Sequence, residues 1–180
     1  MQTIKKEGYI EGDLIIEGNL ELTEHLTVSG RIQVSGYIDC NGYSITAGGS
    51  ITAGGSITAG YSITAGYSIT AGYSITAGGY IKAGGSITAG GSITAGYSIK
   101  AEDSIMAQLY ITAKSTIYSG IYIYSGLVTW RKRDEDDLKI TCSKLLKGSV
   151  EFGKLIETGI EDAKNPKEII IEGATYILKQ

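Results

Sequence analysis

The sequence predicts an all-β protein whose larger part is a three-sided parallel β-helix. Isoleucine recurs at every sixth position from Ile45 to Ile123, and a second, smaller residue follows each isoleucine two positions later. Alternate side chains of a strand point to the same face, so both residues of each pair should line one interior. Strands this short are stable only when successive coils stack and pair their backbones. An α-helix is excluded because a period of six matches no 3.6-residue stripe.

Nineteen six-residue units cover about residues 12–126 and share the consensus G-[GY]-S-I-T-A. Leucine or isoleucine holds the equivalent position in the early units, from Leu14 to Ile38. One inserted residue near Asn41 and Gly42 then resets the phase. Serine before each isoleucine and threonine after it should point outward, and the glycines should let the chain turn the corner between strands.

Tyrosines indicate how many units make one coil. The residue two before the isoleucine is tyrosine in three consecutive units, at Tyr61, Tyr67 and Tyr73, and glycine in the next three. Blocks of three fit an 18-residue coil in which rings lie over the glycines of the adjacent coil, although duplication of repeat units also produces blocks. Nineteen units then make about six coils, and a strand spacing of about 4.8 Å gives a prism roughly 30 Å long.

The repeat resembles two known families over about two thirds of the chain. The segments Gly30–Val34 and Gly36–Cys40 resemble the G-x-I-x-[AGV] coils of the bactofilin-like polymer-forming family, which implies a right-handed parallel β-helix. The six-residue period also resembles the left-handed hexapeptide β-helix of acyltransferases. The order aliphatic-x-small at Ile63–Ala65 reverses the acyltransferase order, so we favour the right-handed form. Either resemblance describes a shape rather than a site.

We divide the chain into a β-helix over residues 1–128 and a β-rich capping or oligomerisation module over residues 129–180. The charged run from Arg131 to Asp137 indicates a solvated linker or turn, with a small antiparallel appendage beyond it. Acids near the N-terminus should discourage stacking at that open end. The expected strands of the appendage are 138–145, 150–157, 168–171 and 175–178, the last two as a hairpin. The acids are Glu7, Glu11, Asp13, Glu17 and Glu21.

The central coils are chemically sparse, which argues against an enzyme. The chain has one histidine, His25, and two cysteines, and Lys82 is the only charged side chain between Tyr43 and Ile99. No acid–base pair or metal-ligand spacing is present, so no catalytic residue, cofactor or metal is predicted. The net charge of −3 argues against nucleic acid, and no apolar run is long enough to cross a membrane. We expect a cytoplasmic location, or the host cytoplasm if the protein is phage-encoded.

Three surfaces are candidate sites. Aromatic residues crowd the end of the repeat and form the candidate partner-binding site. Hydroxyl ladders on one face resemble the T-x-T faces of ice-binding β-helices, and a short basic stripe on a second face is a candidate contact for a small anion or nucleic acid. The aromatic residues are Tyr110, Tyr118, Tyr122, Tyr124 and Trp130. The ladders are Ser56, Thr58, Ser74, Thr76, Ser92, Thr94 and Thr112, and the stripe is Lys82 and Lys100.

These observations lead to three functional hypotheses. The first is a rigid, non-enzymatic scaffold that binds a protein or associates with itself, as a homo-oligomer, expected to be a dimer joined through the C-terminal module or a solenoid end. One form of it is a phage- or prophage-encoded inhibitor of a host factor. The second is an ice-binding protein that uses the Ser-x-Thr ladders. The third, and the least favoured, is a relative of the hexapeptide acyltransferases.

Overall fold

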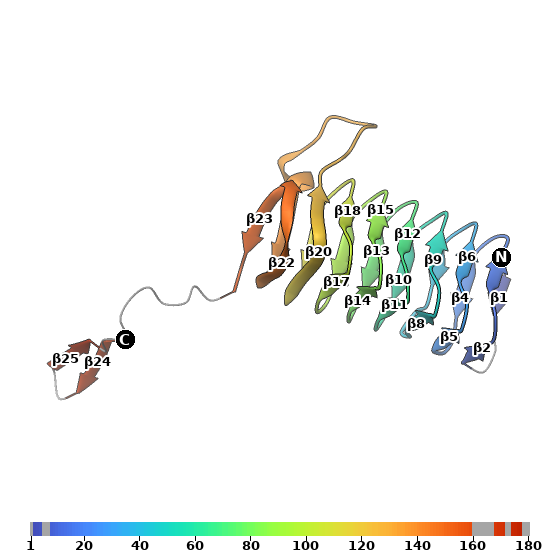
Figure 1. Ribbon diagram of the computed structural model, residues 1–180, viewed down its shortest axis with the longest axis horizontal. Helices are drawn as coiled ribbons and strands as arrows, with labels where there is room; N and C mark the ends of the chain where they lie inside the picture. The colour runs from blue at the N-terminus through green and yellow to red at the C-terminus, as the bar shows by residue number, and fades with distance from the viewer. Residues whose placement is uncertain (1, 5–7, 160–167, 172–173, 178–180) are drawn as a thin grey trace.

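The computed structural model describes residues 2–4, 8–159, 168–171 and 174–177, and it confirms a parallel β-solenoid (Figure 1). Short strands follow one another around the coil, and each pairs in parallel with the strand one full turn away. Three stacks of strands result, which we call the first, second and third faces. The first face is a nine-stranded sheet, and β20 joins the second and third faces into one fourteen-stranded sheet. The right-handed winding stays a prediction.

The strands divide among the faces as follows. The first face holds β1 (Gln2–Ile4), β4 (Leu20–Leu22), β7 (Ile38–Asp39), β10 (Ile57–Ala59), β13 (Ile75–Ala77), β16 (Ile93–Ala95), β19 (Ile111–Ala113), β21 (Lys139–Cys142) and β23 (Lys154–Glu157). The second holds β2 (Tyr9–Ile10), β5 (Leu26–Val28), β8 (Ile45–Ala47), β11 (Ile63–Ala65), β14 (Ile81–Ala83) and β17 (Ile99–Ala101). The third holds β3 (Leu14–Ile16), β6 (Ile32–Val34), β9 (Ile51–Ala53), β12 (Ile69–Ala71), β15 (Ile87–Ala89) and β18 (Ile105–Ala107). The strands β20 (Thr116–Ser125) and β22 (Lys144–Phe152) each cross both the second and third faces.

The coil length of 18 residues is confirmed by the strand register. Ile57 pairs with Ile75, and Ile75 pairs with Ile93, so equivalent residues stack directly on one another. The coil that contains the inserted residue is one longer, because Ile38 pairs with Ile57. Asn41 absorbs the insertion with a positive φ of 46°, and its side-chain Nδ2 donates to the carbonyl oxygen of Leu22 at 2.7 Å. An asparagine suits this position because it tolerates the left-handed conformation.

The core is the predicted isoleucine ladder. Every isoleucine of the series from Ile45 to Ile123 has no exposed surface, and the alanines two positions later are also buried. Full burial of an aliphatic side chain of this size contributes about 1.5–3 kcal/mol to folding. Two buried serines replace alanine in β20: Ser119 donates to the carbonyl oxygens of Asp103 and Tyr122, and Ser125 donates to that of Leu109.

The corner serines link successive coils, a role that the repeat pattern did not reveal. The backbone N–H of Ser68 donates to the hydroxyl oxygen of Ser50 at 3.4 Å, and that of Ser86 donates to Ser68 at 3.3 Å. In the early coils the acceptor at this position is the side chain of Asp13, Asn19 or His25. His25 accepts from the N–H of Ser44 at 3.1 Å through Nδ1, so the single histidine has a structural bond.

The glycines serve close approach between coils rather than an unusual backbone conformation. Positive φ angles occur at five described glycines, none of them in the uniform repeat that begins at Ile45 and ends at Ala101. A Cβ atom at Gly66 would lie 2.0 Å from the carbonyl oxygen of Gly48 one coil earlier, and one at Gly72 would lie 2.1 Å from that of Gly54. These glycines lie in the bends between strands, as expected, but without a left-handed backbone. The missing Cβ lets the coils stack at their ladder spacing.

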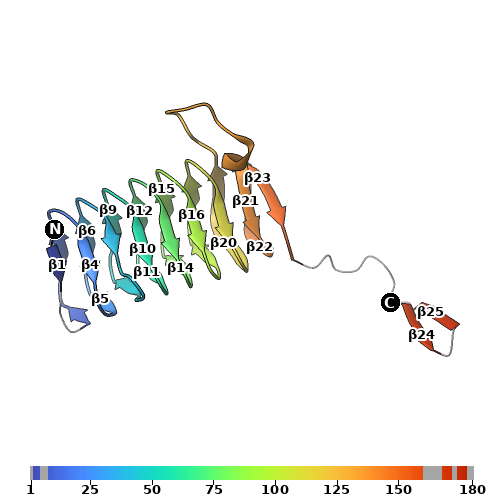
Figure 2. The same ribbon diagram turned by 180° about the vertical axis from the view of Figure 1, so that it is seen from behind.

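The solenoid has about eight coils rather than six, because it extends at both ends of the repeat (Figure 2). The strands β1 and β2 precede the first regular unit and complete an extra coil. At the other end β21, β22 and β23 pair in parallel with β19, β20 and β21. The expectation that the strands at 138–145 and 150–157 belong to an antiparallel appendage is wrong, since β21 to β23 pair in parallel and the inner residues Ile140 and Cys142 continue the core. Only β24 (Glu168–Ile171) and β25 (Ala174–Ile177) form the predicted antiparallel hairpin.

Candidate functional site

The five aromatic residues of the predicted partner site do not share one surface. Tyr110 lies just before β19 on the first face, and Tyr118 lies in the half of β20 that belongs to the second face. Tyr122 and Tyr124 lie in the other half, on the third face, where their ring centroids are 6.2 Å apart. Trp130 is exposed in the loop that follows β20. One coil therefore distributes residues that are close in sequence over three faces.

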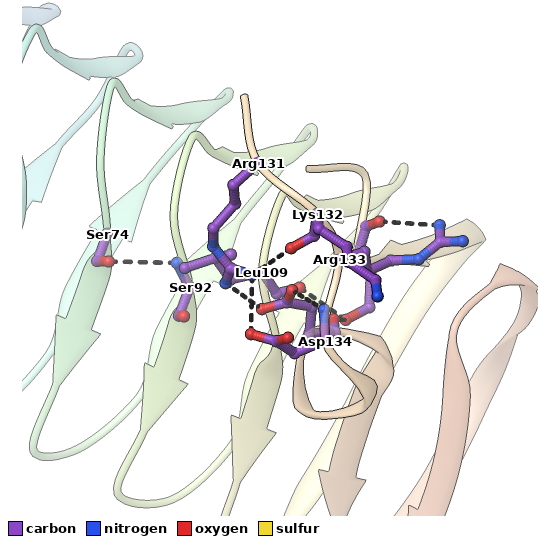
Figure 3. Close-up of polar contacts among 10 residues, drawn as sticks. Ser74, Ser92, Leu109, Arg131, Lys132, Arg133 and Asp134 are labelled. Atoms are coloured by element: carbon purple, nitrogen blue, oxygen red, sulfur yellow. Dashed lines mark hydrogen bonds and ion pairs between the residues drawn. The ribbon is translucent and has the colours of Figure 1, made fainter. Parts of the chain in front are cut away.

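The loop from 126 to 138 is more ordered than the predicted solvated linker (Figure 3). Arg131 bonds the carboxylates of Asp134 at 3.0 Å and Asp137 at 2.7 Å, and a short 3₁₀-helix, η1 (Glu135–Leu138), leads into β21. Burial would raise the pKa of the Asp137 carboxyl, but bonds from the Asp134 N–H and the Arg131 guanidinium outweigh it and lower that pKa. The Arg133 guanidinium lies 4.9 Å from the centre of the Phe152 ring.

The hydroxyl ladders have the predicted register on the first face. Thr58, Thr76, Thr94 and Thr112 pair in sequence across four adjacent strands. The serine hydroxyls of the array are less available for contact with a ligand or with ice. The Ser74 hydroxyl accepts the Ser92 N–H at 3.2 Å (Figure 3), and Ser92 is only 5% exposed. Only the threonine row is therefore displayed as the ice-binding hypothesis requires.

The basic stripe forms the wall of a groove on the second face. Lys82 pairs with Lys100, and Lys100 pairs with Tyr118, so the three side chains form one outward row. A second outward row, which consists of Ser62, Tyr80, Ser98 and Thr116, runs beside it on the other side of the inward isoleucines. The space between the rows is a groove of about 490 Å³. Its lining residues are Ser62, Thr64, Tyr80, Ile81, Lys82, Ser98, Ile99, Lys100, Thr116, Tyr118 and Leu146.

Aromatic and charged contacts fix the groove walls. The Tyr80 ring stacks on that of Tyr97 with centroids 5.4 Å apart and planes 17° apart. The Lys100 ammonium lies 4.9 Å from the centre of the Tyr118 ring and 2.8 Å from a carboxylate oxygen of Glu102. The hydrogen bond between them raises the pKa of Lys100 and lowers that of Glu102. Among the described residues Lys82 has no carboxylate within 4.0 Å, which makes it the unneutralised cation of the groove.

The two ends of the solenoid are a second candidate surface. Several inward-facing residues there are only partly buried, in contrast to the fully buried isoleucines between them. In the described chain the strands β1, β2 and β3 each have a parallel partner on one side alone, as do β22 and β23 at the other end. Unpaired parallel edges offer backbone donors and acceptors to another chain. The partly buried residues are Ile10 and Leu14 at one end, and Leu145, Val150 and Leu155 at the other.

The described residues contain no group of three or more metal-ligating side chains and no helix that could span a membrane. Both cysteines are buried; burial raises the pKa of the Cys40 thiol to about 12 and that of Cys142 to about 11. Comparison with protein-family models found no match, and neither did comparison with curated proteins or with solved structures. The groove and the two ends are therefore interpreted from their own geometry.

Proposed function

We propose that the protein is a rigid, non-enzymatic scaffold that associates with further copies of itself through its two ends. The observation that supports this best is the incomplete burial of the end coils. Leu145, Val150 and Leu155 point into the core at one end, and Ile10 and Leu14 do so at the other, yet none is fully covered. Stacking one copy on another would bury these apolar residues and extend the parallel ladders.

Charge favours contact between opposite ends over contact between like ends. Residues 8–24 contain five acids, Glu11, Asp13, Glu17, Glu21 and Glu24, and no base. Residues 139–159 contain four lysines, Lys139, Lys144, Lys147 and Lys154, against two acids. An acidic end and a basic end attract, whereas two acidic ends repel. A contact between unlike ends repeats without closing, so the expected product is an open filament or a short stack of subunits.

Sedimentation velocity over a range of protein concentrations tests the proposal. We expect larger species as concentration rises, and fewer of them in 1 M salt, where charges are screened beyond about 3 Å. A variant with Lys144→Glu and Lys154→Glu has two acidic ends, and one with Glu11→Lys, Glu17→Lys and Glu24→Lys has two basic ends. Each should remain a monomer alone, and the two should assemble when mixed.

The control is Lys82→Thr, which changes one charge in the middle of the solenoid and should leave assembly unchanged. A monomer at every concentration and salt would overturn the proposal. Assembly that survives both charge reversals would overturn the charge argument while leaving the apolar ends as the contact. Binding of a host factor, and a phage or prophage origin, stay predictions from the sequence.

Ice binding is a second candidate because the threonine row from Thr58 to Thr112 keeps its register over four strands. Measurement of thermal hysteresis tests it directly. The outward serine hydroxyls are partly committed to bonds between coils, so the threonine row alone would have to contact ice. Absence of ice shaping at high protein concentration would remove this candidate without affecting end-to-end association.

A further inference from the structure

The groove on the second face is the place where the repeat departs from its consensus. The outward positions that flank the inward isoleucine are normally serine and threonine, as in Ser62 and Thr64. One coil later they are Tyr80 and Lys82, and the following coils carry Lys100 and Tyr118. The replacements convert a flat hydroxyl face into a channel with an aromatic and cationic lining.

The channel is partly preorganised. Stacking on Tyr97 supports one side of the Tyr80 ring, which stays 53% exposed. Tyr118 is held between two ammonium groups, Lys100 at 4.9 Å and Lys147 at 5.5 Å from its ring centre. The channel holds about 490 Å³, within the size range of small-molecule sites, which is about 300–1,000 Å³.

We propose that this groove binds a small nucleotide. A nucleobase presents a flat π-face that stacks on tyrosine, and Tyr80 offers such a face. Its phosphate requires a cation, and Lys82 is two residues away on the same strand face, about 6.6 Å along the chain. Lys82 has no carboxylate partner in the described chain, so its ammonium is available. The hydroxyls of Ser62 and Thr64 lie at the same groove and can bond sugar or phosphate oxygens.

Other ligand classes fit the groove less well. A long nucleic acid needs many phosphate contacts, whereas the groove has three nearby lysines, and one of them is paired with Glu102. An extended peptide is usually held by backbone bonds at a sheet edge, and this groove lies in the middle of a sheet. A neutral sugar would make no use of the Lys82 charge.

Isothermal titration of the full chain with adenosine, guanosine and uridine 5′-monophosphates tests the inference. Adenosine, inorganic phosphate and maltotriose serve as comparison probes. We expect at least one nucleotide to bind roughly tenfold more tightly than adenosine or phosphate alone, because base stacking and the charge-assisted phosphate bond act together. Tyr80→Ser and Lys82→Thr should each weaken binding about fivefold or more. Both restore the residues of the neighbouring coil, so the fold is retained.

The matched control is Tyr73→Gly, which removes an exposed tyrosine outside the groove and should leave affinity unchanged. Equal affinity of the wild type and the Lys82→Thr variant would overturn the proposal, as would the absence of heat with all three nucleotides at millimolar concentration. Tighter binding of maltotriose than of any nucleotide would assign the groove to a sugar. Tighter binding of a 15-nucleotide oligothymidylate, compared at equal nucleotide concentration, would assign the groove to a nucleic-acid polymer. Either of these last two results also overturns the proposal.

Discussion

Replacing Gly72 by alanine should separate two coils and destabilise the solenoid. The new Cβ would lie 2.1 Å from the carbonyl oxygen of Gly54, where ordinary contacts begin near 3.4 Å. The coil must move by about the difference, roughly 1.3 Å, to relieve the overlap. The Gly72 N–H donates to Ala53 at 3.0 Å and the adjacent Tyr73 N–H donates to Gly55 at 3.3 Å, so relieving the overlap weakens both bonds.

The expected cost follows from those two bonds. Weakening two backbone hydrogen bonds, each of which contributes about 0.5–1.5 kcal/mol, costs at most about 1–3 kcal/mol, because Gly72 and Tyr73 are exposed and their N–H groups can bond water instead. Alanine also reduces the conformational freedom of the unfolded chain, which offsets this cost by about 0.4–1 kcal/mol. We therefore expect a net loss of about 1 kcal/mol. Glu102, Gln108 and Lys114 carry a Cβ at the equivalent position of later coils, and their N–H groups keep the equivalent bonds at 3.1–3.2 Å, so the expected cost at Gly72 is modest.

Gly42→Ala is the matched control, because a Cβ there meets no atom within 4 Å and φ is not in the left-handed range. It should leave stability unchanged or raise it by about 0.4–1 kcal/mol. Urea unfolding followed by far-ultraviolet circular dichroism measures both variants. If Gly72→Ala and Gly42→Ala unfold within about 0.5 kcal/mol of each other, close stacking is not the reason for glycine at this position.

Three further predictions concern buried and bonded groups. The buried Cys40 and Cys142 thiols should resist labelling in the folded protein and react on unfolding. Their pKa is higher in the folded protein than in the unfolded chain, so the unfolded chain ionises first and the free energy of unfolding should fall as pH rises above 9. The expected loss for Cys40 is about 1 kcal/mol at pH 10. Arg131→Ala should speed proteolysis of the 126–138 loop roughly fivefold, because Asp137 loses its cation; an unchanged rate would contradict this. Ser68→Ala should cost about 1 kcal/mol in urea unfolding through its lost coil-to-coil bond, and a neutral effect would make that bond dispensable.

The regular part of the fold was predictable because each coil repeats one local rule. The spacing of the isoleucines and the tyrosine blocks predicted the strands, their inward faces and the 18-residue register, all of which are confirmed. Prediction failed where the repeat ends. Strands β21 to β23 have no six-residue consensus, and only the available edges of β19 and β20 make them parallel.

The candidate sites, like the fold, were predictable where the repeat is regular and not where it ends. Lys82 and Lys100 were predicted to stack because they are 18 residues apart, and they do. The aromatic residues from Tyr110 to Trp130 were grouped by sequence proximity alone, and the coil places them on different faces. Leu146 was not singled out, since nothing in its neighbourhood shows that β22 would close one end of the groove.

The sequence alone determined the coil, its dry interior and the outward rows. Alternation along a strand and a fixed repeat are local properties, and they recur unchanged from one coil to the next. Tertiary structure decided how many coils there are, how the chain pairs beyond the repeat, and how closely the corner glycines approach the preceding coil. Those features depend on distances between segments 18 or more residues apart, and a spacing pattern carries no such distances. The groove, whose walls come from successive coils and from β22, belongs to this second class.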